Sequence, residues 1–201
     1  MLHSGGHLHL GIMPGPEFLH FIRQAARSSE VGAISTQFES ELRAGDDNVH
    51  ALALTACGKS VGAVSFALLP LRFQPGAWSG RIDVVATAPE ARGHGVAGLL
   101  LAGALLDFAS RLGDRWRHVS VVAVHPAIER LARAYELQRI EGGETPLFFR
   151  DLDTPARAES IRLRASRELS RIRTDLDREC ARCQRFVAAD SWCAPGGGGD
   201  S

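Results

Sequence analysis

The sequence has almost no lysine, no excess of charge of either sign and no long uncharged apolar run. Lys59 is the only lysine, and 23 basic residues balance 23 acidic ones. A chain without net charge has no overall field that would attract nucleic acid or an anionic membrane. No stretch reaches the roughly 18 to 20 uncharged apolar residues of a membrane span. We therefore expect neither nucleic acid nor a membrane as a partner.

Cysteines are also few, and their spacing does not form a disulfide framework. Cys57 falls in an apolar run, whereas Cys180, Cys183 and Cys193 lie near the C-terminus. A disulfide framework would spread paired cysteines over the body of the chain. The first 15 residues lack the basic start and the long apolar segment of a signal peptide. These features predict a reduced, cytoplasmic protein.

The same cysteines are poor metal ligands as a group. Cys180, Cys183 and Cys193 offer three thiols, but no fourth cysteine or histidine follows them, and structural zinc takes four ligands. The N-terminal histidines could bind a metal adventitiously, although a frayed terminus is the favoured interpretation. These histidines are His3, His7 and His9. We predict no metal site.

The hydrophobic pattern predicts one mixed α/β domain. A chain of 201 residues with 45% hydrophobic and 23% charged residues is typical of a soluble globular protein with one core. Strands and helices alternate in a way that places helices across a mixed sheet. The predicted order is a strand at 7–13, helices at 15–30 and 32–43, strands at 49–57, 61–69 and 81–88, a helix at 96–113, a strand at 118–124, a helix at 127–140 and a strand at 145–152.

A different pattern begins at Thr154, which with Pro155 provides a good helix start. Beyond it, apolar residues recur every three or four positions along a helix of about 30 or more residues. These residues are Ile161, Ala165, Leu169, Ile172, Leu176, Cys180, Cys183 and Val187. Such a stripe needs cover from its own domain, a second copy or another protein, and we favour a homodimer contact or a lid over the acceptor side. The predicted division is a domain at 1–152, a long helix at 153–190 and a flexible tail at 191–201.

The most informative motif is PEARGHGVAG, residues 89–98, between the strand at 81–88 and the helix at 96–113. Gly93 and Gly95 allow unusual backbone angles and a close ligand. The first N–H groups of the following helix have no partners inside it, so they form an anion site suited to a pyrophosphate, with Arg92 beside it. A plain strand-to-helix turn remains the alternative. The third glycine of a dinucleotide fingerprint and the Gly-Lys-Ser/Thr of a Walker loop are both missing.

The longer segment VVATAPEARGHGVAGLLLAGAL resembles the cofactor motif of the GCN5-related N-acetyltransferases, the GNAT superfamily. That motif is Gln/Arg-x-x-Gly-x-Gly/Ala, and Arg92, Gly95 and Ala97 occupy its fixed positions. The predicted element order also matches that fold from about residue 7 to residue 150. The resemblance implies a GNAT-like acyl-CoA N-acyltransferase fold, α/β with a mixed sheet, carrying a long C-terminal helical extension.

The resemblance also implies acetyl-CoA as the donor and an amine of a small molecule or peptide as the acceptor, in direct attack within a ternary complex. Backbone groups of Ala86 and Thr87 would pair with the pantetheine arm, and Arg92 would line the pyrophosphate loop. The backbone amides that would hold the pyrophosphate are those of Gly93, His94, Gly95, Val96 and Ala97. The rival interpretation is a catalytically silent domain that acts in binding or assembly through its C-terminal helix.

Catalytic residues are less well indicated. In LARAYELQRI, Tyr135 stands where the family often has a tyrosine that protonates the CoA thiolate, although core packing would also explain it. Arg139 and Ile140 replace the usual Gly-Phe, and the expected asparagine early in that helix is missing. Asp83 and His125 are candidate bases, each of which a structural role would also explain.

The acceptor pocket has only an indirect signal. In such folds specificity lies in the first two helices and in a loop between strands, here residues 15–48 and 70–80. The aromatic and histidine side chains in these regions suggest a partly apolar pocket, and core packing explains most of them equally well. They are Phe18, His20, Phe21, Phe38, Phe73 and Trp78.

Overall fold

The computed structural model describes residues 8–26, 48–56, 59–141 and 146–181. They form a seven-stranded sheet in the order β1-β2-β3-β4-β5-β7-β6. Only β4 and β5 pair in parallel, and all other neighbours are antiparallel. The elements are β1 (Leu8–Ile12), α1 (Gly15–Ala26), β2 (Val49–Ala56), β3 (Lys59–Pro70), β4 (Trp78–Thr87), α3 (Val96–Leu112), β5 (Trp116–Val122), α4 (Pro126–Ala134), β6 (Gln138–Ile140), β7 (Leu147–Asp151) and α5 (Pro155–Ala181). The predicted mixed α/β fold is confirmed.

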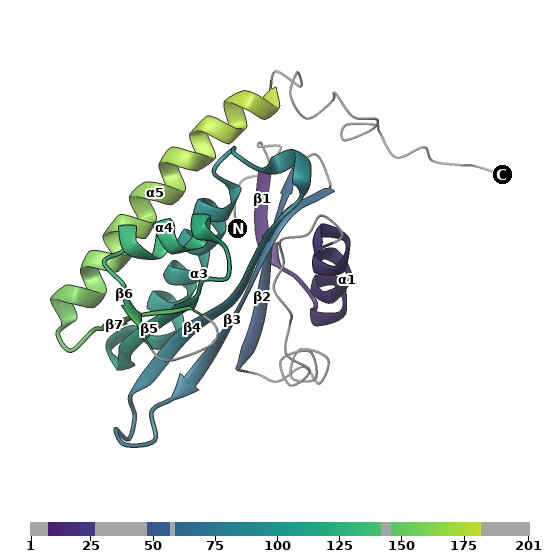
Figure 1. Cartoon of the computed structure of the whole chain (residues 1–201). Helices are drawn as coiled ribbons and strands as arrows, with labels where there is room; N and C mark the ends of the chain where they lie inside the picture. Colours follow the sequence, from purple (N-terminus) through teal and green to yellow (C-terminus); the bar gives the residue numbers. More distant parts are fainter. Residues whose placement is uncertain (1–7, 27–47, 57–58, 142–145, 182–201) are drawn as a thin grey trace.

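The sheet separates two hydrophobic layers (Figure 1). Helix α1 covers one face, where Phe18 and Ile22 pack on the small alanines of β2, β3 and β4. Helices α3, α4 and α5 lie on the other face over a larger cluster that includes Phe66 and Phe108. Gly62 of β3 allows the first turn of α3 to approach closely, because a Cβ there would come within 2.6 Å of the side chain of Val96.

Helix α3 is the centre of the larger layer. Among the described residues, the stretch Val96–Arg115 is the one that is long and apolar enough by composition to cross a membrane. In the fold it is a core helix, with most of its side chains buried between the sheet and α5. It ends as predicted at Gly113, whose φ of 52° favours glycine.

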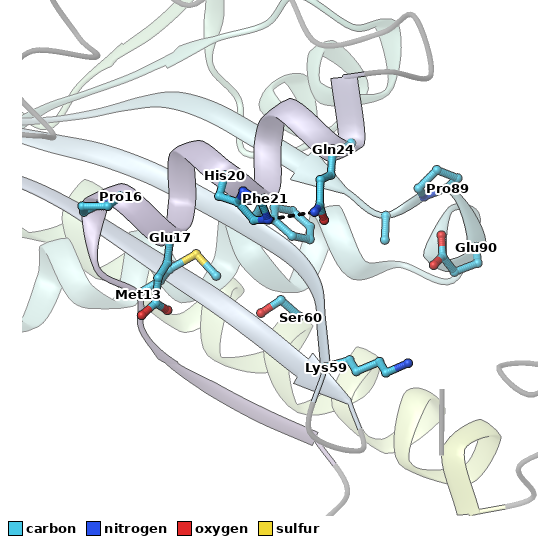
Figure 2. Close-up of a pocket in the computed structure, with 12 residues that line it drawn as sticks. Met13, Pro16, Glu17, His20, Phe21, Gln24, Lys59, Ser60, Pro89 and Glu90 are labelled. Carbon is cyan, nitrogen blue, oxygen red and sulfur yellow. Dashed lines mark hydrogen bonds between the residues drawn. The ribbon is translucent and has the colours of Figure 1, made fainter. Parts of the chain in front are cut away.

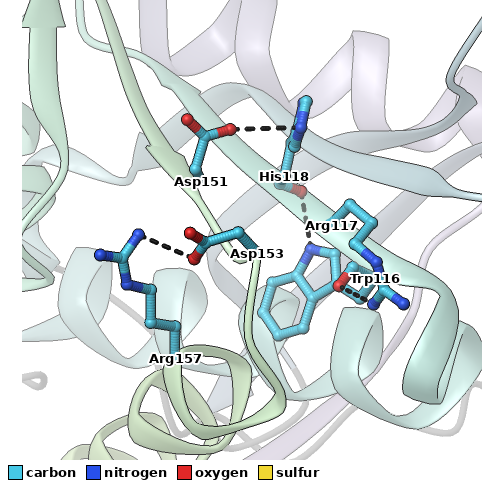
Figure 3. Close-up of polar contacts among 6 residues, drawn as sticks. All are labelled: Trp116, Arg117, His118, Asp151, Asp153 and Arg157. Carbon is cyan, nitrogen blue, oxygen red and sulfur yellow. Dashed lines mark hydrogen bonds and ion pairs between the residues drawn. The ribbon is translucent and has the colours of Figure 1, made fainter. Parts of the chain in front are cut away.

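A set of polar contacts fixes the corner where the chain passes from β7 into α5 (Figure 3). His118 Nε2 on β5 lies 3.2 Å from Asp151 Oδ1 at the end of β7. The buried Leu152 donates its N–H to the carbonyl of Arg117 at 2.7 Å. Asp153 pairs with Arg157 of the first turn of α5 at 2.8 Å. The start of α5 is therefore anchored to the edge of the sheet.

From this corner, α5 runs back along α3 and α4 (Figure 1). Its apolar stripe is buried in the same cluster as the sheet, with Ile161 and Ala165 at most 1% exposed. The described part of the stripe thus has its partner within the chain, so it needs no second copy for cover. The remaining stripe positions, from Leu176 on, lie outside the described side chains, and the homodimer stays a prediction.

The predicted helix at 127–140 is wrong in its second half. Helix α4 ends at Ala134, Glu136 adopts a left-handed φ of 61°, and residues 138–140 form β6 on β7. Tyr135 and Leu137 are buried on either side of the exposed Glu136, which is the alternation of an extended segment rather than of a helix. The strand predicted at 81–88 starts earlier, at Trp78. The predicted helix at 32–43 lies outside the described residues.

Candidate donor site

Strands β4 and β5 pair only over the first half of β4. Their pairing ends at Ile82 and Val121, although β4 continues to Thr87. The register between β3 and β4 shifts at the same place, and Asp83 is the extra residue of a β-bulge. A bulge bends its strand away from the regular ladder. Within the described part of the chain, the second half of β4 therefore presents backbone N–H and C=O groups without a strand on that side.

The loop after β4 forms a cradle of backbone donors. Pro89–Ala91 make one 3₁₀ turn, and Gly93 and Gly95 follow, each with a φ of 80° that other residues rarely adopt. Gly95 is the N-cap of α3 and provides no side-chain cap. The first hydrogen bond of the helix runs from the Leu99 N–H to the Gly95 carbonyl. The preceding N–H groups have no intrahelical acceptor, as an anion site requires.

A cavity of about 480 Å³ joins the open edge of β4 to this cradle. Its other walls come from α4 and from α5. Of the residues that the resemblance assigns to the donor, all but His94 line the cavity. They are Ala86, Thr87, Arg92, Gly93, Gly95, Val96 and Ala97. The structure brings these residues to one place, and their binding of a donor stays a prediction.

His125 lies on the wall of the cavity but is occupied by a structural contact. It is the N-cap of α4, and its Nδ1 accepts a hydrogen bond from the Ala127 N–H at 3.1 Å. Because an amide N–H can only donate, Nδ1 is unprotonated and the neutral ring carries its hydrogen on Nε2. In this state His125 presents a donor to its surroundings. To act as a base through Nδ1, His125 would have to break its hydrogen bond with the Ala127 N–H.

Tyr135 lies beneath α5 and is 3% exposed. Its hydroxyl has no hydrogen-bond partner among the described residues, and it is not part of the cavity wall. Burial, and next the negative charge of Glu168, raise the pKa of Tyr135 to about 12, against a lowering effect of Arg164. The phenol is therefore protonated at neutral pH, the state that a general acid needs. Its catalytic role stays a prediction.

Comparison with known proteins identifies structures that have the same fold. No family model and no curated protein sequence matches the chain. Solved structures do match. NAA60 from Arabidopsis thaliana in complex with acetyl-CoA has a TM-score of 0.56 and 13% identity, covering 73% of this chain and 99% of its own. An acetyltransferase of the GNAT family from Streptococcus pneumoniae has a TM-score of 0.52 and 17% identity, covering 72% and 99%.

The chain has the GNAT fold. The predicted resemblance is thus confirmed at the level of the fold. A structure named as a transcriptional regulator from Bacillus halodurans has the same TM-score of 0.52, with 17% identity and 68% of this chain covered against 97% of its own. Proteins with this fold therefore carry different names, and the site must support any conclusion on activity.

Asp83 of β4 points toward the face of the sheet that α1 covers. Ile82 faces the cluster under α3, so its regular neighbour Arg81 faces the α1 side. Asp83 pairs at 2.6 Å with Arg81, which lies two positions earlier on the same face. The carboxylate is mostly buried, with a side-chain exposure of 13%. A role for Asp83 as a base stays a prediction.

A second cavity, of about 950 Å³, lies beside α1 (Figure 2). Its apolar wall includes Met13 and Phe21, and its carboxylates are those of Glu17 and Glu90. Lys59 lines it at the start of β3.

Only some of the predicted acceptor residues reach this second cavity. Phe21 and His20 line it. Phe18 is a core residue with no exposure, and Phe73 is 96% exposed. Phe38 lies outside the described residues.

Helices α4 and α5 contribute residues to the donor cavity that carry no local signal in the sequence. Arg130 of α4 and three residues of α5, Glu168, Arg171 and Ile172, line its wall. Ile172 belongs to the apolar stripe of α5, and nothing local in the sequence connects it with a loop almost 80 positions earlier. Its position follows from the packing of α5 on α3 (Figure 1). The described residues contain no group that could hold a metal ion, and Cys183, Cys193, His3 and His7 lie outside them.

Proposed function

We propose that this protein is an acyl-CoA-dependent N-acyltransferase that transfers acetyl from acetyl-CoA to an amine of a small molecule or peptide. The observation that carries the proposal is the continuity of three features. The open edge of β4, the uncapped N-terminus of α3 and the cavity between them offer a strand partner for an amide-bearing arm and an anion site for a pyrophosphate. A matching structure, NAA60, was solved with acetyl-CoA.

In this proposal the pantetheine amides pair with the backbone of Ala86 and Thr87, and the loop amides from Gly93 to Ala97 receive the pyrophosphate. The amine nitrogen attacks the thioester carbonyl carbon, the C–S bond breaks, and the CoA thiolate takes a proton from the Tyr135 hydroxyl, which regains one from solvent. Because Tyr135 lies outside the cavity wall, this step requires the phenol to move toward the sulfur. The proton of the attacking amine leaves to solvent or to Asp83. No covalent enzyme intermediate is needed.

The acceptor is proposed to enter from the α1 side. Asp83 faces that side, and the cavity beside α1 carries the carboxylates of Glu17 and Glu90 next to the apolar Met13 and Phe21. Carboxylates attract an ammonium group, and the apolar wall suits a hydrocarbon body. These features support an amine with an apolar portion, in a small molecule or at the end of a peptide.

The test is a panel of amines assayed for acetyl-CoA-dependent thiol release, with product mass as the second readout. Because the protein has 4 cysteines of its own, the control is the enzyme with acetyl-CoA and no amine. Acetyl-CoA should also raise the melting temperature through binding to the folded state. No stabilisation by saturating acetyl-CoA, CoA or longer acyl thioesters would contradict the proposal.

One observation favours a second candidate, a GNAT-fold domain that binds acyl-CoA without turnover. The Tyr135 hydroxyl is buried under α5 and does not reach the donor cavity wall. In this case acetyl-CoA binds and stabilises the protein, but no amine releases thiol, and Tyr135→Phe leaves the binding of acetyl-CoA unchanged. Thiol release that depends on the Tyr135 hydroxyl would exclude this candidate.

A further inference from the structure

Helix α5 lies outside the part of the chain that resembles the GNAT motif, yet it forms one wall of the donor cavity. Ile172 lies against the cradle itself. A Cβ added to Gly95 or to Gly98 would come within 3.1 Å of its side chain. Ile172 is 4% exposed and belongs to the same core cluster as α3. The position of α5 on the cradle is therefore fixed by core packing.

Two residues that precede Ile172 on α5 carry charge to the same wall. Arg171 and Glu168 both line the cavity. They form an ion pair, with Arg171 Nη2 2.8 Å from Glu168 Oε1. Partners three positions apart on a helix face each other, so the pair holds the guanidinium against the helix beside the cavity. A guanidinium has five N–H donors and can bind a second anion while it keeps the first.

Arg171 is one of three arginines on this cavity, each from a different element. Arg92 comes from the loop after β4, and Arg130 comes from α4. Glu168 is the one carboxylate that the described residues place on the wall. The backbone amides of the cradle suit a pyrophosphate, but CoA also carries a 3′-phosphate monoester with a charge near −2. Arginine forks are the side chains best suited to such a group.

We propose that Arg171 on α5 binds the 3′-phosphate of CoA, so that the C-terminal helix is a component of the donor site. This inference rests on the proposed function, since it assumes that CoA occupies the cavity. Glu168 is a positioning residue for Arg171. The neighbouring Ile172 keeps the helix, and with it the guanidinium, at a fixed place relative to Gly95.

The experiment compares binding of CoA and of dephospho-CoA, which lacks only the 3′-phosphate, by titration calorimetry. Wild type should bind CoA more tightly than dephospho-CoA. Arg171→Ala should weaken CoA binding by roughly tenfold, as for loss of a charge-assisted hydrogen bond, and leave dephospho-CoA unchanged. The matched control is Arg167→Ala, which removes the same charge from an exposed position of α5 that does not line the cavity.

Each outcome decides the inference. An equal loss for both ligands, no loss at all, or tighter binding of CoA by Arg171→Ala would overturn it. Tighter binding would instead mean that α5 obstructs the donor. If wild type binds neither ligand, the proposed function fails first, and this inference fails with it. Arg171 has an exposed side chain, so the variant is expected to fold, and a circular-dichroism melt verifies that it does. Glu168→Gln should weaken CoA binding less than Arg171→Ala does.

Discussion

The guanidinium carbon of Arg164 lies 5.4 Å from the centre of the Tyr135 ring. With Glu168 one turn further along α5, it covers the single tyrosine of the chain. A cation over an aromatic face is attracted to the ring, while the phenol below it stays neutral because its charged form would be buried. The C-terminal helix therefore covers this phenol, whose pKa is raised first by burial and then by Glu168, while Arg164 lowers it.

The first prediction is an alkaline titration of Tyr135, followed by phenolate absorbance. Because the chain has one tyrosine, the signal reports this residue alone. Burial raises the pKa of Tyr135 to about 12 in the folded protein, and in denaturant it should return to about 10. A folded-state transition near pH 10 would contradict the buried position. Glu168→Gln should lower the folded-state pKa, since Glu168 raises it.

The second prediction concerns stability at high pH. A phenol whose pKa is raised by folding favours the folded state below the unfolded pKa, and that contribution is lost as the pH rises from about 10 to about 12. Two pKa units correspond to roughly 2.7 kcal/mol. Denaturant unfolding of wild type and Tyr135→Phe should therefore show the wild type losing stability relative to the variant above pH 10. Parallel curves for the two proteins would contradict this linkage.

The third prediction separates packing from catalysis at the same residue. Tyr135→Phe removes a buried hydroxyl without a partner among the described residues, so its stability at pH 7 should be unchanged or about 1 kcal/mol higher. If the hydroxyl protonates the CoA thiolate, kcat should fall by about 100-fold with little change in the KM for acetyl-CoA. An active, equally fast Phe variant would remove Tyr135 from the mechanism.

The fourth prediction uses the two glycines of the cradle as a matched pair. Gly93 and Gly95 share a φ of 80°, but a Cβ meets nothing within 4 Å at Gly93 and lies 3.1 Å from Ile172 at Gly95. Both alanine variants should lose about 1 to 2 kcal/mol from the left-handed backbone, and Gly95→Ala should lose more. Denaturant unfolding measures the difference. Equal losses of stability in the two variants would mean that Ile172 moves aside to accommodate the added methyl group.

The fifth prediction tests the cap at His125. His125→Ala should lower stability by about 0.5 to 2 kcal/mol, and His125→Asn should recover most of it, because asparagine also caps a helix. The thiol-release rate is the second readout. If Asn restores the rate together with the stability, His125 acts by positioning α4. If only the histidine supports turnover, it takes part in the chemistry.

Some parts of the site could be predicted from the sequence and others could not. The cradle was predictable because its signals are local, with glycines at the positions of positive φ and an apolar helix starting at Val96. The bulge at Asp83 has no such signal, because it appears only in the register with β3. The end of α4 was missed because the helical spacing of Ile128, Leu131 and Tyr135 runs to its last turn, and no glycine or proline marks the left-handed φ at Glu136. Arg171 has no local signal either, because it reaches the cavity only through the packing of α5 on α3.

The single lysine has a consequence for the chemistry of the protein itself. Lys59 lies at the start of β3, on the wall of the second cavity beside α1 (Figure 2). Every other basic side chain is that of an arginine or a histidine. Acyl thioesters modify ε-amines spontaneously, whereas a guanidinium keeps its proton at neutral pH and is not a nucleophile. Lys59 is therefore the one side-chain amine that the proposed donor could acetylate. Any acetyl-lysine found on the protein by mass spectrometry would mark one known position.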